Sequence, residues 1–163
     1  GACTLCLDAC PTKAFPAPGV VDARRCIAYQ SIENRALVPL PLRRGFRGRV
    51  FGCDVCQDVC PFNRTEIPVG DRRFEPRPLG LMQPADMAAL SRPEFERLAA
   101  GMALARAQYD GIRRNALLAL GAARAEAALP VVERLTQDEN PVVREAAVWA
   151  LAQISERRRN QDL

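Results

Sequence analysis

Cysteines dominate the chemistry available to this chain, because six of its seven cysteines form two runs of the same spacing. Cys3–Pro11 reads C-x2-C-x3-C-P, and Cys53–Pro61 repeats that pattern. Proteins with two 4Fe-4S clusters carry C-x2-C-x2-C-x3-C-P, in which three closely spaced cysteines bind one cluster and the cysteine before proline binds the other. The first run lacks its leading cysteine, which we expect immediately before Gly1.

The spacing predicts which cysteine belongs to which cluster. Cys26 stands alone between the two runs. Two cubanes need eight thiolates, which the seven cysteines and the expected eighth supply. The first cluster is assigned to the expected cysteine with Cys3, Cys6 and Cys60, and the second to Cys10, Cys26, Cys53 and Cys56. Each proline should stop the chain from continuing as helix beyond the cysteine that crosses over.

Two other cysteine chemistries compete with the iron–sulfur interpretation. Disulfides suit small secreted chains, but an odd cysteine count and 48% hydrophobic residues over 163 positions argue against them. Zinc is the stronger alternative, because C-x2-C pairs are also zinc ligands, although the third cysteine and the proline are not part of that pattern. The absence of histidine excludes histidine acid–base chemistry, axial-histidine haem and Rieske ligation in these residues.

Positive charge gathers in the cysteine-rich half of the chain, whose net charge is +4 overall. The densest basic run contains Arg43, Arg44, Arg47 and Arg49, with Phe46 among them. Such a loop can hold phosphates and stack on a base. The alternative is a solvated surface loop in an arginine-rich protein.

The composition divides the chain into two domains and a linker. Residues 1–66 contain every cysteine and should form short helical turns around metal clusters. Residues 67–79 are rich in proline and charge and should be an extended linker. Residues 80–163 are rich in alanine and leucine and should be helical. No stretch approaches the ~20 apolar residues of a membrane span, so we expect a cytoplasmic protein with no membrane association.

Helix punctuation defines the second domain. Ser91-x-x-Glu94 is a capping box that begins a helix over 92–107, and Asn140-Pro141 begins another that extends to about Glu156. Two further helices are predicted near 111–122 and 126–138.

An internal repeat relates two of these helices, because 112–120 aligns with 143–151 at an offset of 31 residues. It is typical of HEAT-like helical hairpins, which either grip a large partner or only bury their own apolar stripe. Trp149 is predicted to lie in the core.

Four segments carry a resemblance to a known family. They are C-P-T at 10–12, P-G-V-V-D-A-R-R-C-I at 18–27, Y-Q-S-I-E at 29–33 and F-G-C-D-V-C-Q-D-V-C-P-F-N at 51–63. On these segments, and more loosely on the helical repeat, the chain resembles the carboxy-terminal part of epoxyqueuosine reductase. The resemblance implies a mainly α fold, with a ferredoxin-like two-cluster domain followed by HEAT-like repeats.

The resemblance also implies an activity, which is the cobalamin-dependent reduction of epoxyqueuosine to queuosine in tRNA. The clusters would carry electrons from an external donor to cobalamin. The expected proton donor and most of the cobalamin site belong to the family's amino-terminal half, so no catalytic residue is assigned here. The alternatives are a stand-alone two-cluster ferredoxin and a cobalamin-dependent reductase of the dehalogenase type.

The resemblance leaves a few residues of this chain as candidate contacts. Asp54 either caps the following turn, which we favour, or contacts cobalamin. Gln57 and Asn63 could satisfy backbone groups near the clusters. We expect a monomer that binds tRNA carrying epoxyqueuosine through the following arginines: Arg35, Arg43, Arg44, Arg47 and Arg49.

Overall fold

The computed structural model describes residues 2–64 and 75–161, with side chains described as far as residue 156. The described residues are mainly helical, and their only β feature is an isolated antiparallel bridge between Ala17 and Val20. The α-helices are α1 Leu5–Ala9, α2 Ile27–Ile32, α3 Leu40–Arg43, α4 Val55–Asp58, α5 Pro78–Leu81, α6 Pro84–Ala89, α7 Arg92–Ala99, α8 Tyr109–Ala123, α9 Leu129–Leu135 and α10 Pro141–Gln161. In the described residues, no helix is long and apolar enough to cross a membrane.

The two cysteine runs adopt the same local structure, as their shared spacing predicts. In each run the middle cysteine lies in a short helix, α1 or α4, and these two helices pack together. The cysteine before proline leaves the helix in an extended conformation, with φ −62° and ψ 117° at Cys10 and φ −72° and ψ 124° at Cys60. A following proline disfavours the helical region for the residue before it, so both cysteines turn away from their own helix.

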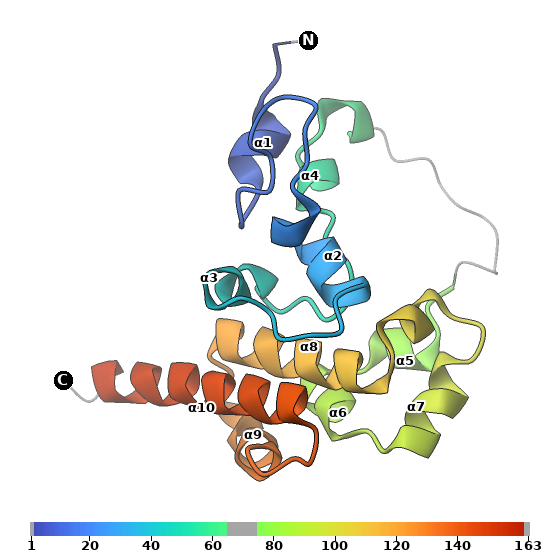
Figure 1. Cartoon of the computed structure of the whole chain (residues 1–163), viewed down its shortest axis with the longest axis vertical. Helices are drawn as coiled ribbons and strands as arrows, with labels where there is room; N and C mark the ends of the chain where they lie inside the picture. The colour runs from blue at the N-terminus through green and yellow to red at the C-terminus, as the bar shows by residue number, and fades with distance from the viewer. Residues whose placement is uncertain (1, 65–74, 162–163) are drawn as a thin grey trace.

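The helical part is built around α8, a 15-residue helix that packs against α6 and α10, while α9 packs on α10 (Figure 1). The repeat predicted for α8 and α10 is confirmed on its buried face, since Ile112 and Val143 are both fully buried, as are Ala116 and Ala147. Gly121 lets α8 and α10 approach closely, because an added Cβ would lie 2.6 Å from the Trp149 ring. Trp149 itself packs against the core, as predicted.

The two helix starts predicted from caps are confirmed, whereas helix ends differ, and α10 continues past the predicted end near Glu156 to Gln161. Ser91 and Glu94 form the full capping box, and the Asn140 side chain accepts from the Val142 amide at 2.9 Å. The helix expected over 92–107 ends at Ala99, because Gly101 takes a left-handed φ of 69° and a 3-10 turn follows. The helix expected over 126–138 is shorter as well and is a 3-10 turn followed by α9.

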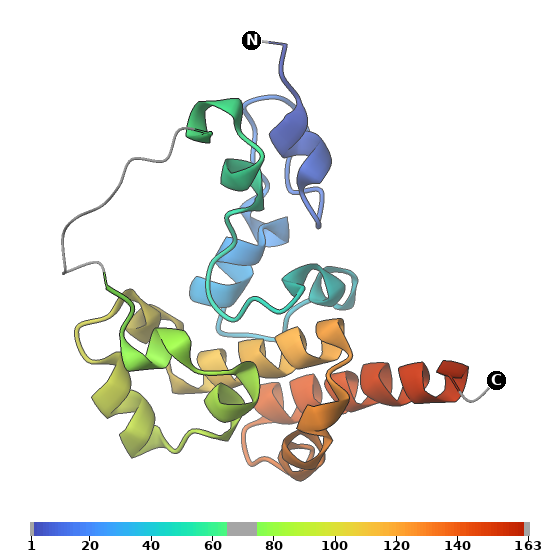
Figure 2. The ribbon, with the colours of Figure 1, turned by 180° about the vertical axis from the view of Figure 1, so that it is seen from behind.

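The two parts of the chain share one hydrophobic core. The cysteine-rich part packs on α8 through α2 and the 3-10 turn Arg44–Phe46, as both views show (Figures 1 and 2). Phe46 is 0% exposed and belongs to the same buried cluster as the residues of α8 and α10. Of the predicted linker, residues 67–74 lie outside the described residues. Its last residues already belong to the helical part, because α5 begins at Pro78 and Leu79 is fully buried.

Candidate iron–sulfur centre

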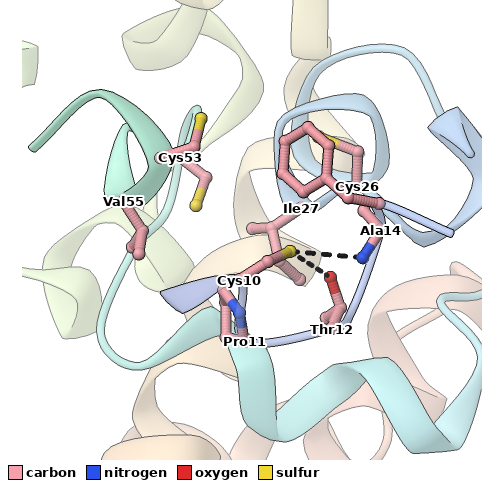
Figure 3. Close-up of a pocket in the computed structure, with 10 residues that line it drawn as sticks. Cys10, Pro11, Thr12, Ala14, Cys26, Ile27, Cys53 and Val55 are labelled. Carbon is pink, nitrogen blue, oxygen red and sulfur yellow. Dashed lines mark hydrogen bonds between the residues drawn. The ribbon is translucent and has the colours of Figure 1, made fainter. Parts of the chain in front are cut away.

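Four cysteines line one pocket of the cysteine-rich part. The pocket is lined by Cys10, Cys26 and Cys53, which Figure 3 labels, and by Cys56. These four come from three separate segments, which α2 and the packing of α1 against α4 bring together. They are the same four cysteines that the spacing assigns to the second cluster.

The pocket supplies hydrogen-bond donors to one of these sulfur atoms. The Ala14 amide donates to Cys10 Sγ at 3.2 Å, and the Thr12 hydroxyl lies 3.7 Å from the same sulfur. Burial raises the pKa of the Cys10 thiol, but the amides of Ala14, Thr12 and Lys13 and the Thr12 hydroxyl outweigh it, so its pKa is lowered. These donors therefore favour the thiolate, which is the form that binds metal.

The sulfur atoms lie close enough to repel one another as thiolates. The pKa of Cys56 is raised, first by burial and then by the nearby charges of Cys53, Cys26 and Cys6. Negative groups gathered in this way need a cationic centre among them. The donor set thus fits an iron–sulfur cluster, whose irons provide that charge.

The arrangement also bears on the disulfide and zinc alternatives. All seven cysteines are free thiols, so the structure forms no disulfide among them. Within the described ranges, no three cysteine or acidic side chains converge as ligands of a single metal ion do. Zinc takes its sulfur ligands at about 2.3 Å from one centre. A cubane instead binds each thiolate at a different iron.

The remaining three cysteines lie along the paired helices α1 and α4. Cys3 is exposed, Cys6 is half-buried in α1, and Cys60 is half-buried after α4. Their assignment to the first cluster stays a prediction.

The side chain of Asp54 does not cap helix α4. Asp54 stands at the N-cap position, but its carboxylate accepts from the Gln57 side chain at 2.9 Å instead of from a backbone amide. The favoured capping role is therefore wrong for this exposed carboxylate. Asn63 does satisfy a backbone group, since it donates to the Gln57 carbonyl at 3.0 Å.

The predicted nucleic-acid surface needs a correction at two residues. Arg43 is 3% exposed, donates to the Val38 carbonyl at 2.8 Å and pairs with Glu145 at 2.5 Å. Phe46 is fully buried and cannot stack on a base. Both residues therefore join the two parts of the chain and do not belong to a binding surface.

The other predicted arginines are accessible. Arg44 and Arg47 are exposed and Arg49 is half-buried, and all three lie in or just after the 3-10 turn that packs on α8. Arg44 pairs loosely with Glu156 at 3.6 Å. Arg35, which precedes α3 in the chain, is exposed and donates to the Ile32 carbonyl at 2.6 Å.

Sequence reasoning missed the contacts that join α8 to the cysteine-rich part. Arg114 and Asn115 are almost fully buried, and both donate to backbone carbonyls of residues 30–36. The sequence did contain a signal, because these two polar residues directly precede the apolar run 116–123 of the same helix.

Comparison with known proteins assigns each part of the chain to a class. Residues 1–63 match the family of 4Fe-4S double cluster binding domains, and residues 96–163 match HEAT repeats. The chain is therefore a double-cluster iron–sulfur domain followed by HEAT repeats, which confirms the predicted fold class.

Relatives identify the family. The chain is 44% identical over 155 residues to the epoxyqueuosine reductase of Pseudomonas aeruginosa, covering 93% of this chain and 42% of that protein. It is 36% identical over 159 residues to the Escherichia coli enzyme, covering 97% of this chain and 42% of the relative. The chain is homologous to the carboxy-terminal portion of epoxyqueuosine reductases, which are oxidoreductases, as the sequence motifs predict.

Solved structures agree with this assignment. A crystal structure of epoxyqueuosine reductase with an epoxyqueuosine-modified tRNA stem loop superposes with a TM-score of 0.86 at 35% identity, covering 94% of this chain and 41% of that one. The enzyme from Streptococcus thermophilus gives a TM-score of 0.81 at 28% identity, covering 96% of this chain and 41% of that one. The chain thus spans about two fifths of the length of the relatives it matches.

Proposed function

We propose that this chain is the electron-relay and scaffold portion of an enzyme that reduces epoxyqueuosine to queuosine in tRNA. The observation that carries the proposal is the gathering of Cys10, Cys26, Cys53 and Cys56 around one pocket, in a chain homologous to epoxyqueuosine reductases. When bound, two 4Fe-4S clusters supply single-electron transfer at low potential.

The residues of this chain have three tasks in that function. The four pocket cysteines would hold one cluster, and Cys3, Cys6 and Cys60 would hold the other with one further thiolate. The amide of Ala14 would stabilise negative charge on Cys10 Sγ, and the apolar side chains of Val55 and Ile27 line the same pocket. The shared core on α8 fixes the pocket relative to the HEAT repeats.

The cobalamin part of the proposal rests on the family resemblance. Among the described residues, Asp54 is the one candidate contact that we retain, because its carboxylate is exposed between two predicted cluster ligands. We place the rest of that site in the portion of the relatives that this chain does not span.

The test of the cluster proposal is a count of iron and acid-labile sulfide per chain after anaerobic reconstitution, with electron paramagnetic resonance of the reduced protein. We expect about eight irons and eight sulfides when the eighth thiolate is supplied, and signals from two interacting clusters. Zinc without sulfide would refute the redox function and leave a structural metal domain on a helical scaffold.

The substrate proposal is tested in the full-length protein that contains this chain. We expect conversion of epoxyqueuosine in a tRNA stem loop to depend on cobalamin and on an external reductant. Conversion that proceeds equally well after Cys26→Ser and Cys56→Ser, which remove two pocket thiolates, would contradict the relay role.

A further inference from the structure

A buried arginine lies where the HEAT repeats meet the cysteine-rich part. Arg114, in the middle of α8, is 1% exposed, and its neighbour Asn115 is 0% exposed. Burying a charge is costly unless every donor of the group is satisfied. The hydrogen bonds of the Arg114 side chain therefore indicate its structural role.

Every N–H of the Arg114 guanidinium has an acceptor, and each acceptor is neutral. One terminal nitrogen donates to the carbonyls of Asn34 and Ala36, both at 2.8 Å. The other donates to the Gln30 carbonyl at 2.7 Å and to Asn115 Oδ1 at 2.8 Å, and Nε donates to Asn115 Oδ1 at 3.1 Å. These bonds use all five donors of an arginine. Asn115 in turn donates to the Ser31 carbonyl at 2.7 Å.

These bonds continue from the end of α2 to two segments that carry pocket cysteines. The Ser31 hydroxyl accepts from the Gly52 amide at 3.0 Å, and Gly52 directly precedes Cys53. The Gln30 side chain donates to the Arg24 carbonyl at 2.5 Å, two residues before Cys26. Cys26 itself is the N-cap residue of α2. One side-chain pair on α8 therefore holds the backbone that positions both cysteines.

The guanidinium also keeps its positive charge inside the protein. Burial, and then the nearby charge of Arg35, lower the pKa of Arg114 to about 10. It therefore stays protonated near neutral pH. Its bonded partners are carbonyl and amide oxygens, so among the described residues no hydrogen-bonded carboxylate cancels the charge.

We propose that Arg114 and Asn115 are positioning residues for the pocket cluster, and that the charge of Arg114 raises the reduction potential of that cluster relative to the other one. A reduced cluster carries one more negative charge than an oxidised one, so a nearby cation stabilises the reduced form. This inference rests on the proposed function only in that the pocket must hold a redox cluster.

The expected size of the effect follows from the length of α2. Its six residues extend about 9 Å, which places the guanidinium roughly 12 Å from the cysteine at the opposite end. At an effective dielectric constant of about 20, a unit charge at that distance changes the equilibrium constant for adding one electron about tenfold, or about 59 mV.

Three substitutions separate charge from structure. Arg114→Met removes the charge and most of the bonds, Asn115→Asp keeps the guanidinium but places a carboxylate against it, and Arg114→Lys keeps the charge without the planar fork. We expect the first two substitutions to lower the midpoint potential of the pocket cluster by about 59 mV, which is a tenfold change in the equilibrium constant for adding one electron. We expect the third to leave the potential near that of the unaltered protein. The potentials of both clusters are measured by redox titration followed by electron paramagnetic resonance, beside thermal unfolding.

Arg113→Met is the matched control. Arg113, the adjacent residue of α8, is also buried at 8% exposed, but it donates to the Ala88 carbonyl and pairs with Asp138. It makes the same change in net charge and should lower stability without moving the pocket cluster's potential. If Arg114→Met does not fold, Asn115→Asp and Arg114→Lys still decide the question.

Two results would overturn the inference. One is an unchanged pocket potential in Asn115→Asp and Arg114→Met with full iron and sulfide content, which would leave the pair a purely structural role. The other is an equal shift in Arg113→Met, which would show an effect of net charge alone. Iron and sulfide are counted first in the unaltered protein, so loss of the proposed function is recognised separately from failure of this inference.

Discussion

At the scale of single residues, the cysteine pocket contains polar groups that contact the sulfur of Cys10. Thr12 is 6% exposed, and its hydroxyl faces Cys10 Sγ at 3.7 Å. Hydrogen bonds to ligand sulfurs raise cluster potentials because they stabilise the more negative reduced state. We therefore expect Thr12, two positions beyond a predicted ligand, to raise the potential of the pocket cluster.

Thr12→Val tests that contribution, because it removes the hydroxyl and keeps the branched shape. We expect the potential of the pocket cluster to fall by about 20–60 mV, a fraction of the ~1.5–3 kcal/mol of a hydrogen bond to a charged group. Thr4→Val is the control, since the Thr4 hydroxyl donates to Asp8 at 2.8 Å on the exposed surface. Equal shifts in both variants would contradict a specific role for Thr12.

The ligand assignment gives a second prediction at this scale. Cys60→Ala should abolish the signal of the cluster bound by Cys3 and Cys6 and leave about four irons in the pocket cluster. Cys26→Ala should do the reverse. Spectra and iron counts of the two variants check the pairing, and loss of the pocket cluster in Cys60→Ala would reverse it.

At the scale of elements, the 3-10 turn Arg44–Phe46 presses on the loop that carries Cys10. A Cβ added at Gly45 would lie 2.7 Å from Thr12 Cγ2 and 3.2 Å from Ile27 Cδ1. Both neighbours are buried and branched, so they have little room to move. Glycine is required here by close approach and not by an unusual φ.

Gly45→Ala is therefore expected to destabilise the protein by about 1–3 kcal/mol and to displace Thr12 beside Cys10. Gly80→Ala is the matched control, because Gly80 lies in α5 with nothing within 4 Å of the added Cβ, so alanine should be neutral or stabilise by up to about 1 kcal/mol. Denaturant unfolding of both variants gives the free energies. A Gly45→Ala protein as stable as its control would show that the turn adapts.

Local sequence signals predicted where helices begin better than they predicted which distant residues pack together. The Ser91 capping box and the Asn140-Pro141 start are confirmed, because a cap is satisfied within a few residues of sequence. The end of α7 at Ala99 was missed, since the turn at Gly101 competes with a periodic apolar pattern that continues past it.

The cysteine spacing is a local signal of the same kind. It predicts the turns at Cys10 and Cys60 and the grouping of the four pocket cysteines. Long-range burial is the part that sequence does not show. Arg43 and Phe46 read as an arginine loop with an aromatic residue, yet 102 positions separate Arg43 from its partner Glu145. Nothing near Arg43 in the chain distinguishes it from the exposed Arg44.

At the scale of the whole molecule, burial of Arg43 leaves a smaller basic surface on the cysteine-rich part. Arg47 and Arg49 follow the turn that packs on α8 and precede Cys53 by only a few residues. A surface in this position would hold a nucleic-acid backbone near the redox centre. The relative solved with a modified tRNA stem loop supports testing tRNA as the partner of this surface.

Replacing Arg47 and Arg49 together with alanine should weaken binding of the epoxyqueuosine-modified tRNA stem loop to the full-length protein. Each arginine that neutralises a phosphate releases counterions, so the slope of log K against log salt should become shallower by about 2. Arg97→Ala with Arg134→Ala makes the same charge change at exposed positions of α7 and α9, and should leave that slope unchanged.

Arg43→Ala should lower thermal stability without altering the slope, because the Arg43 guanidinium already binds the Val38 carbonyl and Glu145. Equal slopes for the two double variants would contradict a tRNA contact at Arg47 and Arg49 and would favour a contact on the HEAT repeats.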